Sequence, residues 1–288
     1  MRPFDLFVGV DWSGNKSRRL KGLSVATASP GDAAPSLVPN PNGGRWTRAD
    51  FMEWLLDLYR TRGRVLCGLD FSFGFPFCDR DCYFPNLPLQ PGGAAELWKF
   101  VEDVCGADPH LAASSFLIEP GLSDHFYTSG SGRARFRVTE TACAEAKLGR
   151  PECMFKIVGH SQVAKSSLTG MRVLSALGAR SNDLAVWPFD PESEAKLVLV
   201  EVFPTAFVRR AGAGIGKVRE AGRLNGVLDR FDSAPVQSGD GFRLTDDMTD
   251  ALITAAALRN LHAQPSLWHP PGLSDRVRRF EGWTFGIA

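Results

Sequence analysis

Apolar residues near the N-terminus predict two strands that pair as a hairpin. Residues 6–12 (LFVGVDW) form a short apolar run that is typical of a buried strand, and this run carries one carboxylate, Asp11, near its end. Residues 13–15 are turn-forming, and residues 21–29 are again strand-like. Because the connection is short, we expect these two strands to be antiparallel, with a brief third strand near residues 45–47.

A helix and a fourth strand are predicted next. Apolar residues recur at intervals of three and four along residues 48–62, which is the spacing of an amphipathic helix. Thr47 is a suitable N-cap for this helix, and Gly63 is a suitable stop. Residues 64–71 then form another apolar run, and Asp70 lies near its end.

The regular alternation of strands and helices lapses between residues 75 and 190. This segment begins with many Pro, Phe and Gly residues and later contains helical patterns, so we expect residues 75–190 to form an insertion or lid. Residues 196–203 predict a fifth strand, with Glu201 near its end. Helical patterns follow at 216–231 and, with a strongly helical Ala/Leu content, at 246–259.

This order of elements places the chain in the α/β class, as a single domain over residues 1–288 with a mixed sheet flanked by helices. Of the 288 residues, 44% are hydrophobic and 23% are charged, which excludes collagen-like, coiled-coil and disordered classes. The sequence shows no signal peptide and no apolar run approaching the ~20 residues of a membrane span. We therefore expect a cytoplasmic protein without a membrane partner, whose six cysteines are reduced.

Charge is unevenly distributed along the chain. The net charge of +1 argues against a protein that binds long nucleic acid by charge alone. However, residues 131–180 contain nine Lys or Arg and three Glu, a net +6 that leaves −5 for the rest. This distribution suits an anionic substrate held over a separate acidic site, and a solvated basic face would have the same composition.

Acidic residues lie near the carboxyl ends of three predicted strands: Asp11, Asp70 and Glu201. In an open α/β sheet, ligands bind at this edge. Asp247 and Asp250 add two carboxylates about one turn apart on the last long helix. Because clustered carboxylates repel one another unless cations neutralise them, the pattern predicts Mg²⁺ or Mn²⁺ held by Asp11, Asp70, Asp247 and Asp250.

The order of the elements resembles the ribonuclease H-like fold. Several short motifs resemble, more closely, the family catalogued as domain of unknown function 429, whose members are predicted RNase H-like nucleases. These motifs are VGVDWSG, GLDFSFGFP, FKIVGHSQVAKSSLTG, WPFD, VEVFPTA, DDMTDALITAAAL and EGWTFGI. The resemblance spans nearly the whole chain and implies an RNase H-like fold with its large insertion between the fourth and fifth strands.

The resemblance also implies roles for individual acids. Asp11 matches the first-strand acid that bridges two metals, Asp70 matches the fourth-strand acid, and Asp250 or Asp247 matches the acid on the final helix. Glu201 departs from the pattern, because the simplest ribonucleases H have no catalytic glutamate on the fifth strand. Its role is open between a metal ligand, an orienter of a ligand and a partner of a basic residue. The catalytic set on this hypothesis is Asp11, Asp70, Glu201 and Asp250.

Substrate binding is assigned to polar and basic residues in three places. The candidates are Ser13, Lys16, Arg133, Arg135, Arg137, Lys156, Gln162 and Lys165. The first two resemble the start of a phosphate loop in the actin and sugar-kinase ATPases. The three arginines alternate, so in a strand they would point to one side and contact phosphates, whereas in a surface loop they would have no common role. The last three flank a turn that is expected to begin a helix, where backbone N–H groups bind anions.

The function predicted from these patterns is hydrolysis of phosphodiester bonds in nucleic acid by a divalent-metal-dependent, RNase H-like nuclease. An ATP-binding phosphotransferase-like protein of the actin and sugar-kinase type is an alternative, and nucleotide binding would distinguish it. A second alternative is a non-enzymatic anion-binding module that retains the acids for structure.

Overall fold

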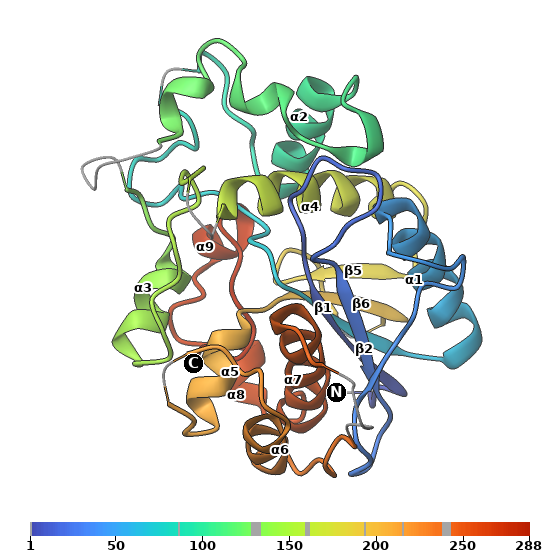
Figure 1. Cartoon of the computed structure of the whole chain (residues 1–288). Helices are drawn as coiled ribbons and strands as arrows, with labels where there is room; N and C mark the ends of the chain where they lie inside the picture. Colours follow the sequence, from blue (N-terminus) through green and yellow to red (C-terminus); the bar gives the residue numbers. More distant parts are fainter. Residues whose placement is uncertain are drawn as a thin grey trace.

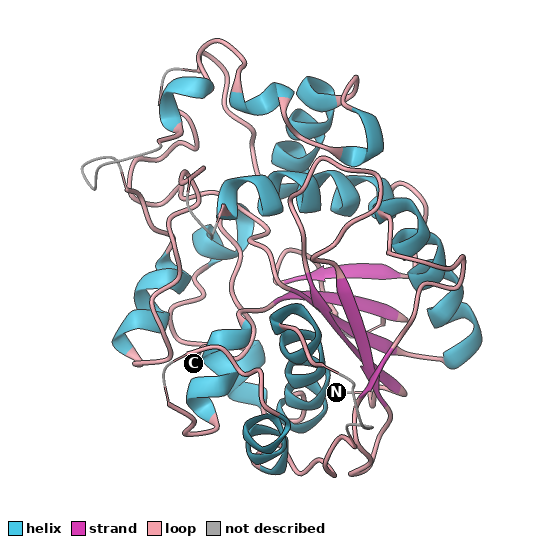
Figure 2. Ribbon diagram, viewed as in Figure 1, coloured by secondary structure: helices cyan, strands magenta, loops and turns pink. Residues whose placement is uncertain are grey.

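The computed structural model describes residues 2–85, 87–127, 134–158, 162–192, 194–214, 216–237 and 243–288. In these ranges the chain forms a six-stranded mixed sheet with helices on both sides (Figure 1, Figure 2). The strands are β1 (Leu6–Asp11), β2 (Ser24–Ala28), β3 (Ser36–Leu37), β4 (Val65–Leu69), β5 (Leu184–Trp187) and β6 (Leu197–Glu201). Their order is β3-β2-β1-β4-β6-β5, with β1 antiparallel to β2 and parallel to β4, and β6 parallel to both of its neighbours. The predicted α/β class is confirmed.

Helices cover both faces of the sheet and one of its ends. The α-helices are α1 (Arg48–Arg62), α2 (Ala94–Cys105), α3 (Val138–Glu145), α4 (Val163–Gly178), α5 (Pro204–Arg210), α6 (Ala221–Asp229), α7 (Asp246–Leu261), α8 (Pro265–Trp268) and α9 (Asp275–Phe280). Short 3₁₀ helices are η1 (Pro109–Leu111), η2 (Ser115–Leu117) and η3 (Ser123–His125). Figure 1 shows α4 lying across one end of the sheet, with α2 beyond it and α7 against a face. No helix in the described part of the chain combines the length and the apolar character that a membrane span requires.

Alternating side chains of the central strands build a separate core on each face of the sheet. In β1, Val8 and Val10 join the core beneath α1, α2 and α4, whereas Phe7 joins the core beneath α5, α7 and α8. In β4, Cys67 joins the core beneath α1, α2 and α4, and Leu66 joins the core beneath α5, α7 and α8. This arrangement follows from the period of two along a strand, and it explains why both strands read as continuous apolar runs rather than alternating ones.

Two paired glycines let α7 approach the centre of the sheet closely. Gly9 in β1 lies opposite Gly68 in β4. A Cβ atom on Gly9 would collide with backbone atoms of Ala251 and Ala255, and one on Gly68 would come within 2.9 Å of Leu258. Small residues on both sides therefore fix the position of α7 over β1 and β4, and with it the position of the acids that α7 carries.

The structure corrects two features of the predicted architecture. The third strand is β3, at residues 36–37, whereas residues 45–47 are not a strand; Trp46 instead accepts a hydrogen bond from the Leu20 amide, at 2.9 Å. Residues 75–190, expected to form an insertion or lid, contribute α4 and β5 to the layered domain, and β5 is an edge strand of the sheet. The hairpin of β1 and β2 and the helix after Thr47 are confirmed.

Candidate functional site

Three carboxylates from three different elements meet at the carboxyl ends of β1 and β4. Asp11 is the last residue of β1, and Asp70 directly follows β4, where its amide donates a hydrogen bond to the Val10 carbonyl at 3.1 Å. The side chains of Asp11 and Asp70 share a hydrogen bond. Asp250, on α7, is buried and close enough to both for its charge to act on them. The three side chains are therefore near enough to one another for their charges to interact.

Crowding of like charges dominates the electrostatics of this cluster, which we call the acid cluster (Asp11, Asp70 and Asp250). Burial raises the pKa of Asp11 well above its ordinary value, and the charges of Asp70 and Asp250 raise it further. Burial, followed by the charge of Asp250, raises the pKa of Asp70 to about 8. Burial also raises the pKa of Asp250. At neutral pH the Asp70 carboxyl group, with its pKa of about 8, therefore retains its proton unless a cation neutralises the cluster.

One lysine supplies part of that neutralisation. The Nζ atom of Lys217 lies 3.1 Å from Oδ2 of Asp250. Burial alone would lower the pKa of Lys217, but the carboxylates of Asp250 and Asp11 raise it above its ordinary value. Among the described residues, no group of three or more His, Cys, Asp or Glu side chains is arranged to hold a metal ion. Metal ligation by the acid cluster therefore remains a prediction.

The donor set of the acid cluster nevertheless suits a hard divalent cation. Its members offer carboxylate oxygens, which Mg²⁺ and Mn²⁺ prefer to nitrogen or sulfur. The raised pKa values of Asp11 and Asp70 show that their negative charges are poorly compensated by the protein itself. A doubly charged ion would remove this repulsion, which the single charge of Lys217 does only in part.

A cleft of about 880 Å³ opens beside the acid cluster, with Asp11 among the residues that line it. One wall is the loop after β1, from Trp12 to Ser17. The lining also includes the beginning of α4, apolar residues at η2 and Asp247 of α7. This volume lies within the range of small-molecule and cofactor sites.

The loop after β1 is held rigidly against its surroundings. The buried guanidinium of Arg48 donates hydrogen bonds to the carbonyls of Ser13, at 2.6 Å, and Asn15, at 2.8 Å. A Cβ atom on Gly14 would collide with the backbone of α4 at Ser166, so only glycine allows this close contact. Burial, with a smaller effect from a neighbouring arginine, lowers the pKa of Arg48 to about 10. The loop is therefore fixed before any ligand arrives.

Four of the predicted substrate-binding residues line this cleft: Ser13, Lys16, Gln162 and Lys165. Lys156 is not among the lining residues, and its Nζ atom lies 2.8 Å from a carboxylate oxygen of Glu152. The structure thus brings together the loop after β1 and the start of α4, which are about 150 residues apart in the sequence.

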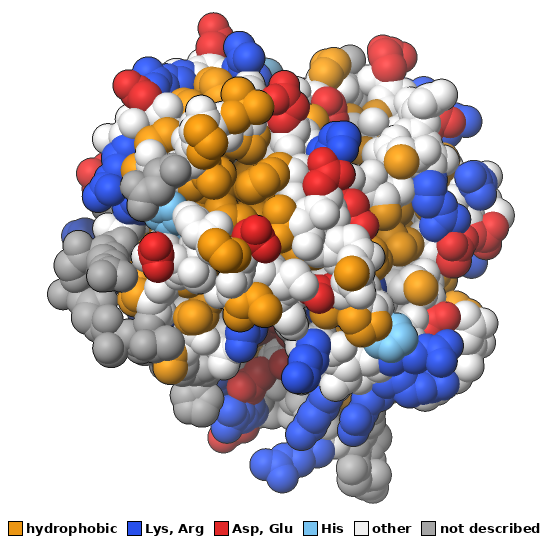
Figure 3. Space-filling model, turned by 90° about the horizontal axis from the view of Figure 1, so that it is seen from above, with side chains coloured by type: hydrophobic (Ala, Val, Ile, Leu, Met, Phe, Trp, Pro, Cys, Tyr) orange, Lys and Arg blue, Asp and Glu red, His pale blue; other side chains and the backbone are white. Residues whose placement is uncertain are grey.

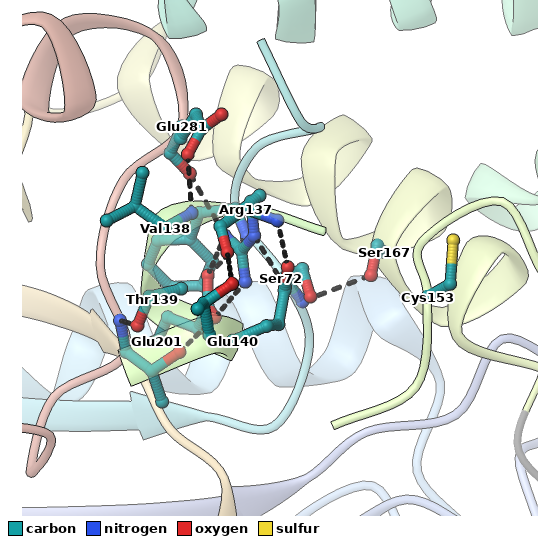
Figure 4. Close-up of polar contacts among 12 residues, drawn as sticks. Ser72, Arg137, Val138, Thr139, Glu140, Cys153, Ser167, Glu201 and Glu281 are labelled. Atoms are coloured by element: carbon teal, nitrogen blue, oxygen red, sulfur yellow. Dashed lines mark hydrogen bonds and ion pairs between the residues drawn. The ribbon is translucent and has the colours of Figure 1, made fainter. Parts of the chain in front are cut away.

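The prediction that alternating arginines contact phosphates is wrong for Arg135 and Arg137, because both side chains point into the protein. Arg135 is 6% exposed and forms a bidentate ion pair with Asp79, with distances of 2.6 and 2.8 Å. Arg137 is 1% exposed and pairs with Glu140 and Glu201 (Figure 4). Arg133 lies outside the described residues. Of the cations in residues 131–180, Arg135, Arg137 and Arg172 are therefore buried and do not form part of a binding surface.

Glu201 is the partner of a basic residue, one of the three roles left open for it. Its two oxygens accept bonds from both terminal nitrogens of Arg137, at 2.6 and 2.8 Å. They also accept bonds from the Thr284 hydroxyl, at 2.7 Å, and from the Phe73 amide, at 2.8 Å. Four donors saturate the lone pairs of a carboxylate, so Glu201 orders the backbone after β4 and has no lone pair left for a metal.

Lys16 belongs to a larger group of cations near the cleft, whose other members were not predicted from the sequence to bind substrate. Lys16, Arg18, Arg19 and Lys21 are exposed residues of the loop between β1 and β2. Counting charges in a short window would have found them, because the chain has no acid between Asp11 and Asp32. The excess of positive charge over residues 131–180 predicted a basic segment elsewhere in the chain instead.

No known family model matches this chain, and no curated protein or solved structure is significantly similar to it. The resemblance of its motifs to the domain of unknown function 429 family therefore stays a prediction. The chemistry of the cleft has to be inferred from its own residues and their geometry.

Proposed function

We propose that this protein hydrolyses phosphodiester bonds as a divalent-metal-dependent, RNase H-like nuclease. The observation that carries this proposal is the meeting of Asp11, Asp70 and Asp250 at one edge of the sheet, beside a cleft with lysines in its walls. Acids gathered beside cations fit a reaction in which a metal acts on a phosphate group that basic residues hold in place.

The fold supports the same proposal. The central β1 is antiparallel to β2 on one side and parallel to β4 on the other, and β6 continues the parallel part of the sheet. This order agrees with the RNase H-like fold that the sequence motifs imply. The edge strand β5 is an addition to the five strands expected from the sequence.

Asp11, Asp70 and Asp250 would hold the metal, with Asp247 beside them at the cleft. A bound Mg²⁺ or Mn²⁺ supplies activation of water and stabilisation of the leaving oxygen. Lys16 and Lys165 bind the substrate phosphate from the cleft walls, and Ser13 and Gln162 can orient it by hydrogen bonds. The closely fixed loop and α4 limit the movement of these groups and so pre-orient the phosphate.

The test compares the wild-type protein with an Asp11→Asn variant, using Asp103→Asn as the matched control. Asp103 is an exposed acid on α2 that pairs with Lys99, so the control makes the same chemical change far from the cleft's chemistry. We expect cleavage of labelled RNA, DNA or hybrid oligonucleotides only with Mg²⁺ or Mn²⁺, complete loss in Asp11→Asn and full retention in Asp103→Asn.

Three results would contradict the proposal. Cleavage that survives in Asp11→Asn would come from another site or a contaminant. Asp11-dependent hydrolysis of ATP without cleavage of any phosphodiester would favour the phosphotransferase-like alternative. If Asp11→Asn only lowers stability and no substrate is turned over, the acids have a structural role in a binding module.

A further inference from the structure

The loop between β1 and β2 carries a dense group of positive charges, which we call the basic loop (Lys16, Arg18, Arg19 and Lys21). These four cations lie within six residues, and all four are exposed. None of them forms an ion pair with a described residue. Surface cations are usually interspersed with acids, so an unmixed group of like charges repels itself and favours an anionic partner.

The backbone of the basic loop is held in place between these charges. The Leu20 side chain is 1% exposed and lies in the core, while its amide bonds to the Trp46 carbonyl at 2.9 Å. The Ser17 amide donates to the side chain of Asn15 at 2.8 Å. Because the loop is anchored on both sides of Arg18 and Arg19, binding an anion would cost little ordering of the backbone.

The basic loop leads from the inside of the cleft to the outer surface. Lys16 lines the cleft, whereas Arg18, Arg19 and Lys21 are not among its lining residues. Five residue steps span at most about 17 Å, so the loop could follow at most roughly five phosphates of a strand at ~3.4 Å each. A single nucleotide in the cleft would leave most of this charge unused.

The lining of the cleft also includes apolar side chains, which the bases of a nucleic acid can contact. It includes Ala113, Leu117 and Ile118, and the Ile118 residue is 77% exposed. Seen from above, hydrophobic side chains gather across one part of the molecular face, and Lys and Arg side chains gather along its lower edge (Figure 3). Phosphates on one side and apolar surface on the other fit a polynucleotide better than an inorganic polyphosphate.

We propose that the basic loop is a docking surface for a nucleic-acid strand that extends out of the cleft, so that the substrate is a polynucleotide rather than a mononucleotide. The inference rests on the proposed function, since it names the substrate class of the same cleft. It adds Arg18, Arg19 and Lys21 to the nucleic-acid contacts suggested by the sequence, in place of the buried Arg135 and Arg137.

The test measures binding of fluorescein-labelled single-stranded oligonucleotides by fluorescence anisotropy in EDTA, which prevents cleavage, at several salt concentrations. The variant is Arg18→Gln/Arg19→Gln/Lys21→Gln, which spares the cleft itself. Each phosphate contact contributes about 0.7 to the slope of log K against log salt for a single strand, so loss of three contacts lowers the slope by about 2. At 0.1 M salt this corresponds to roughly 100-fold weaker binding.

The matched control removes the same net charge from exposed cations elsewhere, with the substitutions Arg60→Gln, Arg62→Gln and Lys99→Gln. We expect this control to change the affinity less than about threefold, because long-range effects are screened beyond ~10 Å at 0.1 M salt. In the wild-type protein the affinity should also increase with oligonucleotide length. It should level off near six nucleotides, because the basic loop can contact at most on the order of five phosphates.

Failure of this inference can be distinguished from failure of the proposed function by a second assay. Hydrolysis of bis(4-nitrophenyl) phosphate, a small phosphodiester, is measured with Mn²⁺ for the wild-type protein and Asp11→Asn. If hydrolysis depends on Asp11 but the salt slope of the triple variant is unchanged, only the docking surface is overturned. The same holds if hydrolysis depends on Asp11 but the wild type binds no oligonucleotide. A reduced slope without Asp11-dependent hydrolysis supports the docking surface and overturns the nuclease.

Discussion

Replacing Asp70 by Asn should stabilise the metal-free protein at alkaline pH and remove much of its pH dependence. Burial, together with the charge of Asp250, raises the pKa of Asp70 from 3.8 to about 8 in the folded protein. Between these two values the folded state holds a proton that the unfolded chain has released. Stability rises with pH only where the unfolded state binds more protons, so here it falls as pH rises from about 4 to about 8.

The size of this effect follows from the shift. Each pKa unit corresponds to about 1.4 kcal/mol, so a change from 3.8 to about 8 gives an upper limit of about 6 kcal/mol between pH 4 and pH 8. Asn cannot ionise, and its amide occupies nearly the same volume as the protonated acid. The substitution also takes one negative charge away from Asp11, whose pKa is raised in part by Asp70, so the whole acid cluster becomes less repulsive.

The assay is urea unfolding in EDTA at pH 5, 6.5 and 8, followed by the same series with Mn²⁺. We expect the wild-type free energy of unfolding to fall by several kcal/mol over this range, the Asp70→Asn value to fall much less, and Mn²⁺ to restore the wild type but not the variant. Asp103→Asn, which removes an exposed acid, should behave as the wild type within about 0.5 kcal/mol. A wild-type stability that does not change between pH 5 and pH 8 would refute the reasoning.

Three further substitutions test how the site is built. Gly9→Ala should displace α7 from the sheet, lower the free energy of unfolding by about 1–3 kcal/mol and weaken Mn²⁺ binding. The control Gly226→Ala, in open space on α6, should raise the free energy of unfolding by roughly 0.5–1 kcal/mol, and equal effects of the two substitutions in urea unfolding would contradict the close approach of α7. Arg137→Met should cost about 3–5 kcal/mol by leaving two buried carboxylates without their partner, against at most about 1 kcal/mol for Lys99→Met in an exposed pair. Lys217→Met should tighten Mn²⁺ binding about tenfold in calorimetry, roughly 1.4 kcal/mol, because a competing cation is removed; weaker binding would show that this lysine supports the ion instead.

The sequence predicted those parts of the fold that depend on neighbouring residues. Apolar runs located β1, β4 and β6, and the acids at the ends of β1 and β4 predicted that Asp11 and Asp70 would meet. The N-cap Thr47 marked the beginning of α1, and its side chain accepts the expected backbone hydrogen bond. The Thr245 side chain caps α7 in the same way. These features are set by local pattern and by the geometry of parallel strands.

Features that depend on distant partners were beyond sequence reasoning. Arg135 pairs with Asp79, 56 positions away, and Arg137 pairs with Glu201, 64 positions away. Because these partners are distant in the sequence, the alternation of the arginines alone predicted an exposed phosphate-binding surface that these two residues do not form. The strand β5 has only four residues, too few for a distinct pattern within a helical region. The approach of Lys217 to Asp250 is likewise fixed by the packing of a connecting segment against α7 rather than by any local motif.

The most direct test of the proposed metal site is a crystal soaked in Mn²⁺ and measured near the manganese absorption edge. The account predicts an anomalous peak among the carboxylates of Asp11, Asp70 and Asp250, with the Nζ atom of Lys217 displaced from Asp250. If Lys217 keeps its ion pair at saturating Mn²⁺ and no peak lies within bonding distance of Asp11, the acid cluster is not a metal site and the nuclease proposal fails with it.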